Sequence, residues 1–98
     1  MEKRSMEILT GVADIIVRNL NPSRIFLFGS RAKKMNGKHA DFDFAVDGAP
    51  PSVAIQRSIN DEVESIAGLY KVDIVYLQSV DKEFRDIILK TGRVVYEK

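Results

Sequence analysis

The chain has 98 residues and a formal net charge of +1, and 45% of its residues are hydrophobic. This composition is typical of one small folded domain, which we expect to span residues 1–98, and it argues against disorder. The small net charge argues against direct nucleic-acid binding, and the absence of cysteine excludes disulfides and thiolate metal sites.

The first expected element is a helix over residues 5–20. Apolar side chains recur there at helical spacing, and the sequence NPS at 21–23 ends the pattern. The N-terminal sequence MEKRSMEILTG is too charged for a signal peptide, and no apolar run approaches the ~20 residues that a membrane span needs. We therefore expect a cytoplasmic protein without a membrane partner.

A strand is expected next, over residues 24–28. The sequence RIFLF is a short apolar run, as in a strand that is buried on both faces, and Gly29 ends it. Ser30 is a suitable N-cap for a short helix over 31–35. This segment therefore predicts a strand that turns directly into a helix.

The sequence DFDFAV at 41–46 predicts a second strand with one polar face. Phe42 and Phe44 point to one side, and Asp41 and Asp43 point to the other. Like charges two residues apart on a strand share a face and repel each other. A solvated strand face is the simplest explanation, but two disfavoured residues on the same face of one strand suggest a binding role.

The remaining chain predicts an alternation of helix and strand. This order indicates a layered α/β or α+β domain with helices packed on a small sheet. The first of these elements is a helix over 52–68, which Pro51 or Ser52 opens and Gly68 ends, with one apolar stripe for the core formed by Ile55, Ile59, Val63 and Ile66. The others are a strand over 71–77 that reads as a core strand apart from Asp73, a helix that begins after Ser79 or Asp81 and ends before Gly92, and a strand over 93–97.

Three carboxylates in this pattern suggest metal chemistry. The Cα atoms of Asp41 and Asp43 are ~6.7 Å apart on one face of a strand, so both side chains can reach the same ions. Mg²⁺ typically takes one or two carboxylates together with substrate phosphates. Asp73 interrupts an apolar strand, where it either pairs with Lys71 or Arg93 or joins the other two acids.

The Gly-Ser pair and the basic residues after it suggest phosphate binding. Glycine lets a ligand approach the backbone closely, and free N–H groups at the start of a helix attract phosphate. A Gly-Ser pair alone is also a common turn, and a basic loop is often only solvated. The basic residues are Arg31, Lys33, Lys34 and Lys38.

The combined pattern resembles the minimal nucleotidyltransferase family of the DNA polymerase beta superfamily. The signature of that family is Gly-Ser, ten residues, and Asp-x-Asp. Gly29, Ser30, Asp41 and Asp43 match it with the spacing intact, and Asp73 lies where the third family acid is expected. The resemblance implies a mixed β-sheet with helices packed on it.

The resemblance also implies roles for the matching residues. Asp41, Asp43 and Asp73 would be the catalytic acids and would hold two Mg²⁺ ions, with ATP as the substrate. Gly29 and Ser30 would bind the β- and γ-phosphates, and we expect Arg31 and Lys33 to assist them.

Small members of this family are commonly encoded beside a helical HEPN-domain toxin. The resemblance therefore implies an antitoxin that transfers AMP from ATP to a tyrosine of such a partner. Two alternatives stay open: a non-catalytic binding module that neutralises a partner sterically, and a nucleotidyltransferase that acts on a small molecule. A homo-oligomer is compatible with each of these hypotheses.

Overall fold

The structure is a computed structural model, and it describes residues 3–29 and 41–98. Helices and strands occupy most of the described chain. They are α1 (Lys3–Leu20), β1 (Arg24–Phe28), β2 (Phe42–Val46), α2 (Val53–Ala67), β3 (Val72–Tyr76), α3 (Lys82–Thr91) and β4 (Arg93–Glu97).

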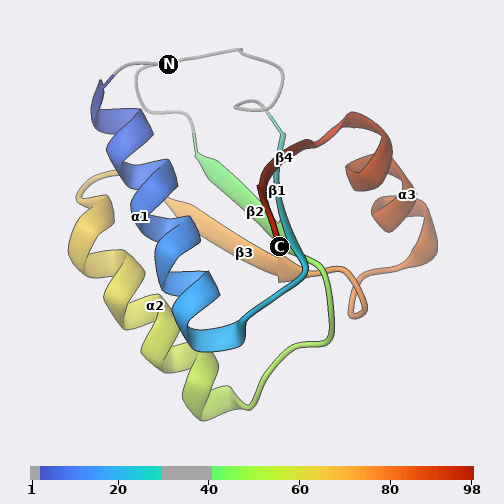
Figure 1. The fold of residues 1–98 in the computed structure, drawn as a ribbon, viewed down its shortest axis with the longest axis horizontal. Helices are drawn as coiled ribbons and strands as arrows, with labels where there is room; N and C mark the ends of the chain where they lie inside the picture. The colour runs from blue at the N-terminus through green and yellow to red at the C-terminus, as the bar shows by residue number, and fades with distance from the viewer. Residues whose placement is uncertain (1–2, 30–40) are drawn as a thin grey trace.

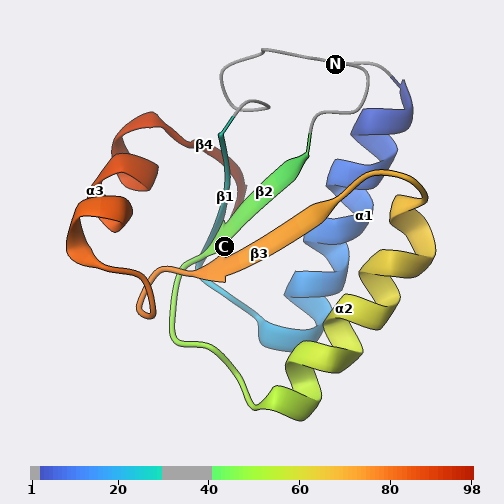
Figure 2. The same cartoon turned by 180° about the vertical axis from the view of Figure 1, so that it is seen from behind.

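The four described strands form one mixed sheet in the order β3-β2-β1-β4. Strand β1 is antiparallel to both of its neighbours, whereas β2 and β3 are parallel. Helices α1 and α2 lie side by side on one face of this sheet, and α3 lies on the other face (Figures 1 and 2). The predicted class, a small mixed sheet with helices packed on it, is therefore confirmed.

The alternation of apolar and polar residues on β2 divides the core into two parts. Phe42 and Phe44 are fully buried in the larger core, between the sheet and the helices α1 and α2. Ala45 faces the opposite way and packs with Phe26 and Ile88 in the smaller core under α3. Asp43 shares the face of Ala45, so the polar side of β2 faces the α3 layer.

The ends of the helices follow local capping signals. The Ser52 side chain accepts a hydrogen bond from the Ile55 N–H at the start of α2, and the Asp81 side chain accepts one from Phe84 at the start of α3. Of the two predicted caps for the last helix, Asp81 is therefore the one used. The short helix expected over 31–35 lies outside the described residues.

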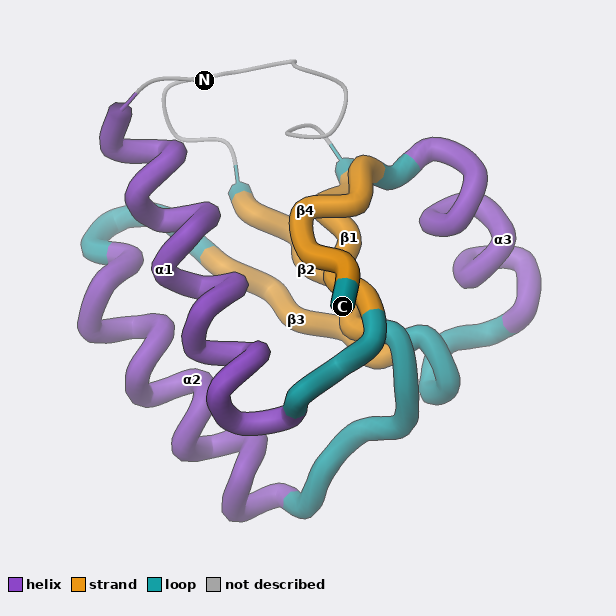
Figure 3. Tube along the Cα trace, viewed as in Figure 1, coloured by secondary structure: helices purple, strands orange, loops and turns teal. Residues whose placement is uncertain are grey.

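Two predictions about burial were wrong. Strand β3 looked like a core strand, but it lies at the edge of the described sheet (Figure 3). Asp73 is exposed there. Ile55 was expected on the buried side of α2, yet it is 40% exposed. Both errors have one cause: the apolar pattern shows which side chains can be buried, whereas the neighbours that bury them come from distant parts of the chain.

No helix in the part of the chain that the structure describes is long and apolar enough to cross a membrane.

Candidate active site

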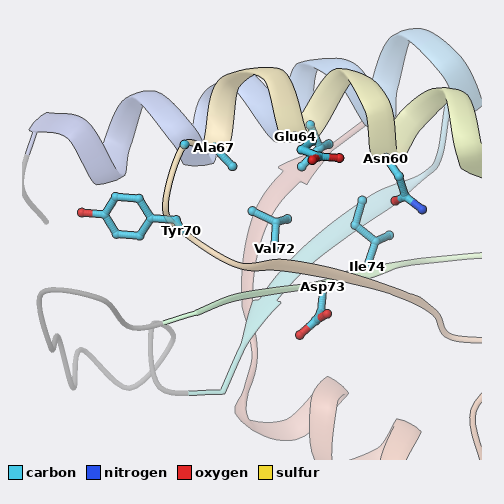
Figure 4. Close-up of a pocket in the computed structure, with 9 residues that line it drawn as sticks. Asn60, Glu64, Ala67, Tyr70, Val72, Asp73 and Ile74 are labelled. Atoms are coloured by element: carbon cyan, nitrogen blue, oxygen red, sulfur yellow. The ribbon is translucent and has the colours of Figure 1, made fainter.

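Two of the three predicted acids lie opposite each other on neighbouring strands. Asp43 of β2 is paired in register with Asp73 of β3. Residues paired in register on adjacent strands project to the same face. In Figure 4, Asp73 points away from Val72 and Ile74, whose side chains lie on the α2 side of β3. The Asp43 and Asp73 carboxylates therefore share the face that carries α3.

The pKa of Asp43 reports how these acids interact. Burial raises the pKa of the Asp43 carboxyl most, and the negative charges of Asp73 and then Asp41 raise it further. The Lys71 ammonium group lowers it in part. Asp41, which directly precedes β2 and is exposed, thus acts on Asp43 together with Asp73. Among the described residues, the three acids therefore form a group of negative charges that Lys71 offsets only in part.

Lys71 lies beside the three acids at this end of the sheet. Its carbonyl accepts a 2.9 Å hydrogen bond from the Phe42 N–H, which extends the β2–β3 pairing so that Lys71 lies beside Asp41. Its Nζ atom is 3.8 Å from Oδ2 of Asp73, and both side chains are well exposed. An ion pair of this kind contributes little to stability. The predicted alternative pairing of Asp73 with Lys71 therefore exists, but it leaves Asp73 accessible.

Arg93 does not pair with Asp73. It lies on β4, at the opposite edge of the sheet. The alternative pairing of Asp73 with Arg93 was therefore wrong. The sequence does not show the strand order, in which β2 and β1 lie between β3 and β4.

Gly29 closes the site on the side of β1. Its φ is +75°, and a Cβ atom built on it would lie only 2.6 Å from Oδ2 of Asp43. A side chain at this position would meet both backbone strain and the carboxylate. The glycine of the motif thus lets the end of β1 approach Asp43. The other residues predicted to bind phosphate, Ser30, Arg31 and Lys33, lie outside the described residues.

An aromatic pair beside the acids was not predicted. Phe28 is paired in register with Asp43, so its ring lies on the same face. The Phe84 ring of α3 packs edge-on against it, with the ring centroids 5.7 Å apart. The sequence signal was weak, because a phenylalanine near the start of an amphipathic helix is usually part of the core. These two rings form an aromatic wall where α3 packs on β1, on the face of the sheet that carries Asp43.

The donor set fits a hard cation that brings other ligands with it. In the described segments, no three His, Cys, Asp or Glu side chains are already gathered as a metal-binding group. The facing pair, Asp43 and Asp73, nevertheless supplies carboxylate oxygens, and Mg²⁺ often uses one or two of these with substrate phosphates. The unbalanced charge around Asp43 would also be relieved by a cation. The site therefore fits a cation that is completed by a phosphate ligand.

A mixed sheet that carries paired acids beside a glycine turn is the architecture of a nucleotidyltransferase. The profile of the family described as "Polymerase beta, Nucleotidyltransferase" matches residues 11–98, and the chain belongs to this family. The family resemblance predicted from the Gly-Ser and Asp-x-Asp motifs is thereby confirmed.

One similar relative is a probable protein adenylyltransferase, MntA, from Haemophilus influenzae. The two sequences are 30% identical over 89 residues, which cover 89% of this chain and 78% of the relative.

Solved structures of toxin–antitoxin complexes contain the same fold. A complex with AMP-PNP matches with a TM-score of 0.74 and 22% identity, over 92% of this chain and 73% of the other. A complex of a tri-AMPylated HEPN toxin from Shewanella oneidensis with its MNT antitoxin matches with a TM-score of 0.70 and 20% identity, over 97% and 73% of the two chains. At these identities the likeness establishes the fold.

Proposed function

We propose that this nucleotidyltransferase transfers AMP from ATP to a hydroxyl group of a HEPN-domain toxin and thereby acts as its antitoxin. The observation that carries the proposal is the facing pair of Asp43 and Asp73, with Asp41 beside it, on the nucleotidyltransferase fold. The similarity to a probable protein adenylyltransferase supports AMP as the transferred group and a protein as the acceptor.

We assign two Mg²⁺ ions to Asp41, Asp43 and Asp73. When bound, such ions neutralise the charge that builds up on the phosphates during transfer. Gly29 lets the backbone that follows β1 pass close to the Asp43 carboxylate, which is consistent with backbone N–H groups of this turn binding a phosphate near that acid. By the family motif, Ser30, Arg31 and Lys33 would contact the β- and γ-phosphates.

Asp73 is the residue placed to receive the acceptor. It is exposed at the edge of the sheet, whereas Asp43 is half-buried between β1 and β3. In the transfer step, the acceptor hydroxyl oxygen forms a bond to the α-phosphorus, and the bond from that phosphorus to pyrophosphate breaks. The hydroxyl proton passes to the Asp73 carboxylate, which acts as the general base. The product is an AMP ester of the acceptor side chain.

Label transfer from α-³²P-ATP to the HEPN-domain partner tests this function. We expect Asp41→Asn, Asp43→Asn and Asp73→Asn each to lower the rate by at least about 100-fold, because each removes a carboxylate assigned to hold the divalent ions and Asp73→Asn also removes the general base. Asp61→Asn, at an exposed position of α2, is the matched control and should retain the rate.

The same variants separate the proposal from its alternatives. If the wild-type chain neutralises the toxin without transferring label, and the three Asn variants neutralise it equally well, the protein is a steric inhibitor. If label reaches a small hydroxyl compound but no protein, the acceptor class is wrong.

A further inference from the structure

We propose that the outer edge of β3 binds an extended segment of the acceptor protein as an added strand, and that this pairing delivers the acceptor hydroxyl to Asp73. The inference rests on the proposed function, since it concerns how the acceptor is presented. It depends on three features of β3: its outward backbone groups, the cleft between it and α2, and the opposite face of the strand, which carries Asp73.

On the outer side of β3, the backbone groups of Val72 and Ile74 pair with no strand in the part of the chain that the structure describes. The Lys71 carbonyl accepts from Phe42, and the Leu77 N–H donates to Val46, so the odd-numbered residues of β3 direct their backbone groups toward β2. The N–H and C=O groups of Val72 and Ile74 therefore point outward. β3 is the last strand of the described sheet, and within residues 3–29 and 41–98 nothing pairs with this side.

A cleft lies between the edge of β3 and helix α2. Its volume is about 360 Å³, and the Val72 and Ile74 side chains form its apolar floor. Asn60 and Glu64 of α2 and the Tyr70 ring lie around it (Figure 4). An added strand would place alternate side chains in this cleft, where Glu64 favours a basic or polar group.

The opposite side of an added strand faces the acids. Successive side chains of a strand point to opposite faces, so the residue aligned with Asp73 projects onto the face shared by Asp43 and Asp73. Neighbouring strands are about 4.8 Å apart, which puts an added strand about 9.6 Å from β2. A long side chain with a terminal hydroxyl, such as tyrosine, spans this gap better than serine.

Charge disfavours a second copy of this chain as the occupant. If two copies paired antiparallel through both outward-facing residues of β3, Val72 of one copy would lie opposite Ile74 of the other. The Asp73 residues of the two copies would then lie directly opposite each other. Like charges directly opposite each other destabilise a strand pair. β-Addition to an exposed edge is, in contrast, a common way to bind an extended peptide through its main chain.

Amide exchange in the complex tests the inference without requiring catalysis. The ¹⁵N-labelled chain is mixed with the HEPN-domain partner, and the exchange of the Val72 and Ile74 amides with solvent is measured by NMR. We expect both amides to exchange at least about tenfold more slowly in the complex. A complex in which both amides exchange as fast as in the free chain overturns the docking mode and leaves the proposed function standing.

Two other outcomes also count against the inference. If no complex forms, the proposed function fails and the docking mode fails with it. If protection rises with the concentration of the chain alone, the edge pairs with a second copy, and the acceptor is not its occupant.

A proline substitution gives an independent test by kinetics. Ile74→Pro removes the outward N–H but leaves the β2 pairing intact, as proline is tolerated on the open side of an edge strand. We expect the KM for the partner to rise about tenfold, with the KM for ATP unchanged. Ile74→Ala, the matched control, shortens the side chain but keeps the N–H. Equal KM values of the two variants for the partner would overturn the inference. If the proline variant does not fold, the amide-exchange experiment alone tests the inference.

Discussion

At the scale of single residues, the backbone at Gly29 passes close to the Asp43 carboxylate. The glycine has a positive φ, and a Cβ atom there would lie 2.6 Å from the Asp43 carboxylate. This contact gives a physical reason for glycine in the motif: the backbone of β1 must pass a carboxylate that is already half-buried. The site thus depends on the absence of one side chain as much as on the presence of the acids.

Gly29→Ala separates this contact from ordinary backbone strain. We expect the free energy of unfolding to fall by about 2–3 kcal/mol, because the variant has both strain and a clash. Gly48→Ala is the control: Gly48 also has a positive φ, of +136°, but a Cβ there would meet nothing within 4 Å. It should cost only about 1 kcal/mol and leave label transfer intact. Urea denaturation measures both, and equal losses in the two variants would show that the carboxylate contact is unimportant.

Asp43 also makes stability depend on pH. Because the folded state raises the pKa of Asp43, ionisation of this carboxyl disfavours folding. The penalty is present at pH values above the folded-state pKa and disappears as pH falls below the ordinary carboxylate value of about 4. Without divalent ions, Asp43→Asn should therefore raise the melting temperature at pH 7 by about 2–5 °C, and the gain should shrink toward pH 4.

Thermal unfolding of Asp43→Asn between pH 4 and pH 8 checks this prediction. Asp61→Asn, which removes a charge from the exposed side of α2, should show no comparable gain at pH 7. A gain for Asp43→Asn that stays constant over the whole range would mean that the Asp43 charge is not its source.

At the scale of elements, an ion pair fixes the end of the β1–β2 pair that lies away from the site. The Nε and Nη2 atoms of Arg24 donate to Oδ2 of Asp47 at 3.0 and 2.9 Å, and the Ser23 hydroxyl donates to the same oxygen at 3.2 Å. The Arg24 guanidinium group also lies over the Phe26 ring. Asp47 follows β2, so this acid holds strands together and takes no part in the site.

Asp47→Asn should therefore weaken the fold without changing the chemistry. We expect the free energy of unfolding to fall by about 1 kcal/mol, because a charge-assisted double hydrogen bond is lost at a half-buried position. Glu7→Gln is the control, since the pair between Glu7 and Arg4 is 3.7 Å long and well exposed. Chemical denaturation should show almost no change for it, and equal losses in both variants would contradict the assigned role of Asp47.

The elements themselves were largely predictable because their signals are local. The strands expected over 24–28 and 93–97 have these bounds in the structure, and Ser52 and Gly68 flank α2 as the capping residues predict. Strand order was not predictable, because the β2–β3 pairing joins segments about 30 residues apart. The apolar sequence of β3 therefore suggested a core strand, although β3 lies at the edge of the described sheet.

At the scale of the whole molecule, the family and the fold were predictable from one motif, and the surroundings of the site were not. The spacing from Gly29 to Asp43 predicted the nucleotidyltransferase family that the profile match shows. The aromatic wall of Phe28 and Phe84 and the position of Lys71 beside the acids depend on how α3 and β3 pack on the sheet. No local pattern carries that information.

The edge position of β3 also links the architecture to the proposed reaction. A central strand would bury Asp73 between two neighbours, whereas an edge strand exposes it to an incoming acceptor. Within residues 3–29 and 41–98, the same position leaves the outward backbone groups of Val72 and Ile74 without a partner strand, beside the proposed catalytic face. One feature of the topology thus underlies both acceptor access and the docking mode inferred above.

The central claim is that Asp41, Asp43 and Asp73 hold divalent ions together with the phosphates of a nucleotide. A crystal structure of the chain with Mn²⁺ and AMP-PNP tests it most directly, since anomalous scattering locates Mn²⁺ independently of the surrounding density. We predict anomalous peaks at the Asp43 and Asp73 carboxylates, in contact with the triphosphate, and their loss in Asp43→Asn. A nucleotide bound elsewhere on the molecule, with no peak at these carboxylates, would contradict the account.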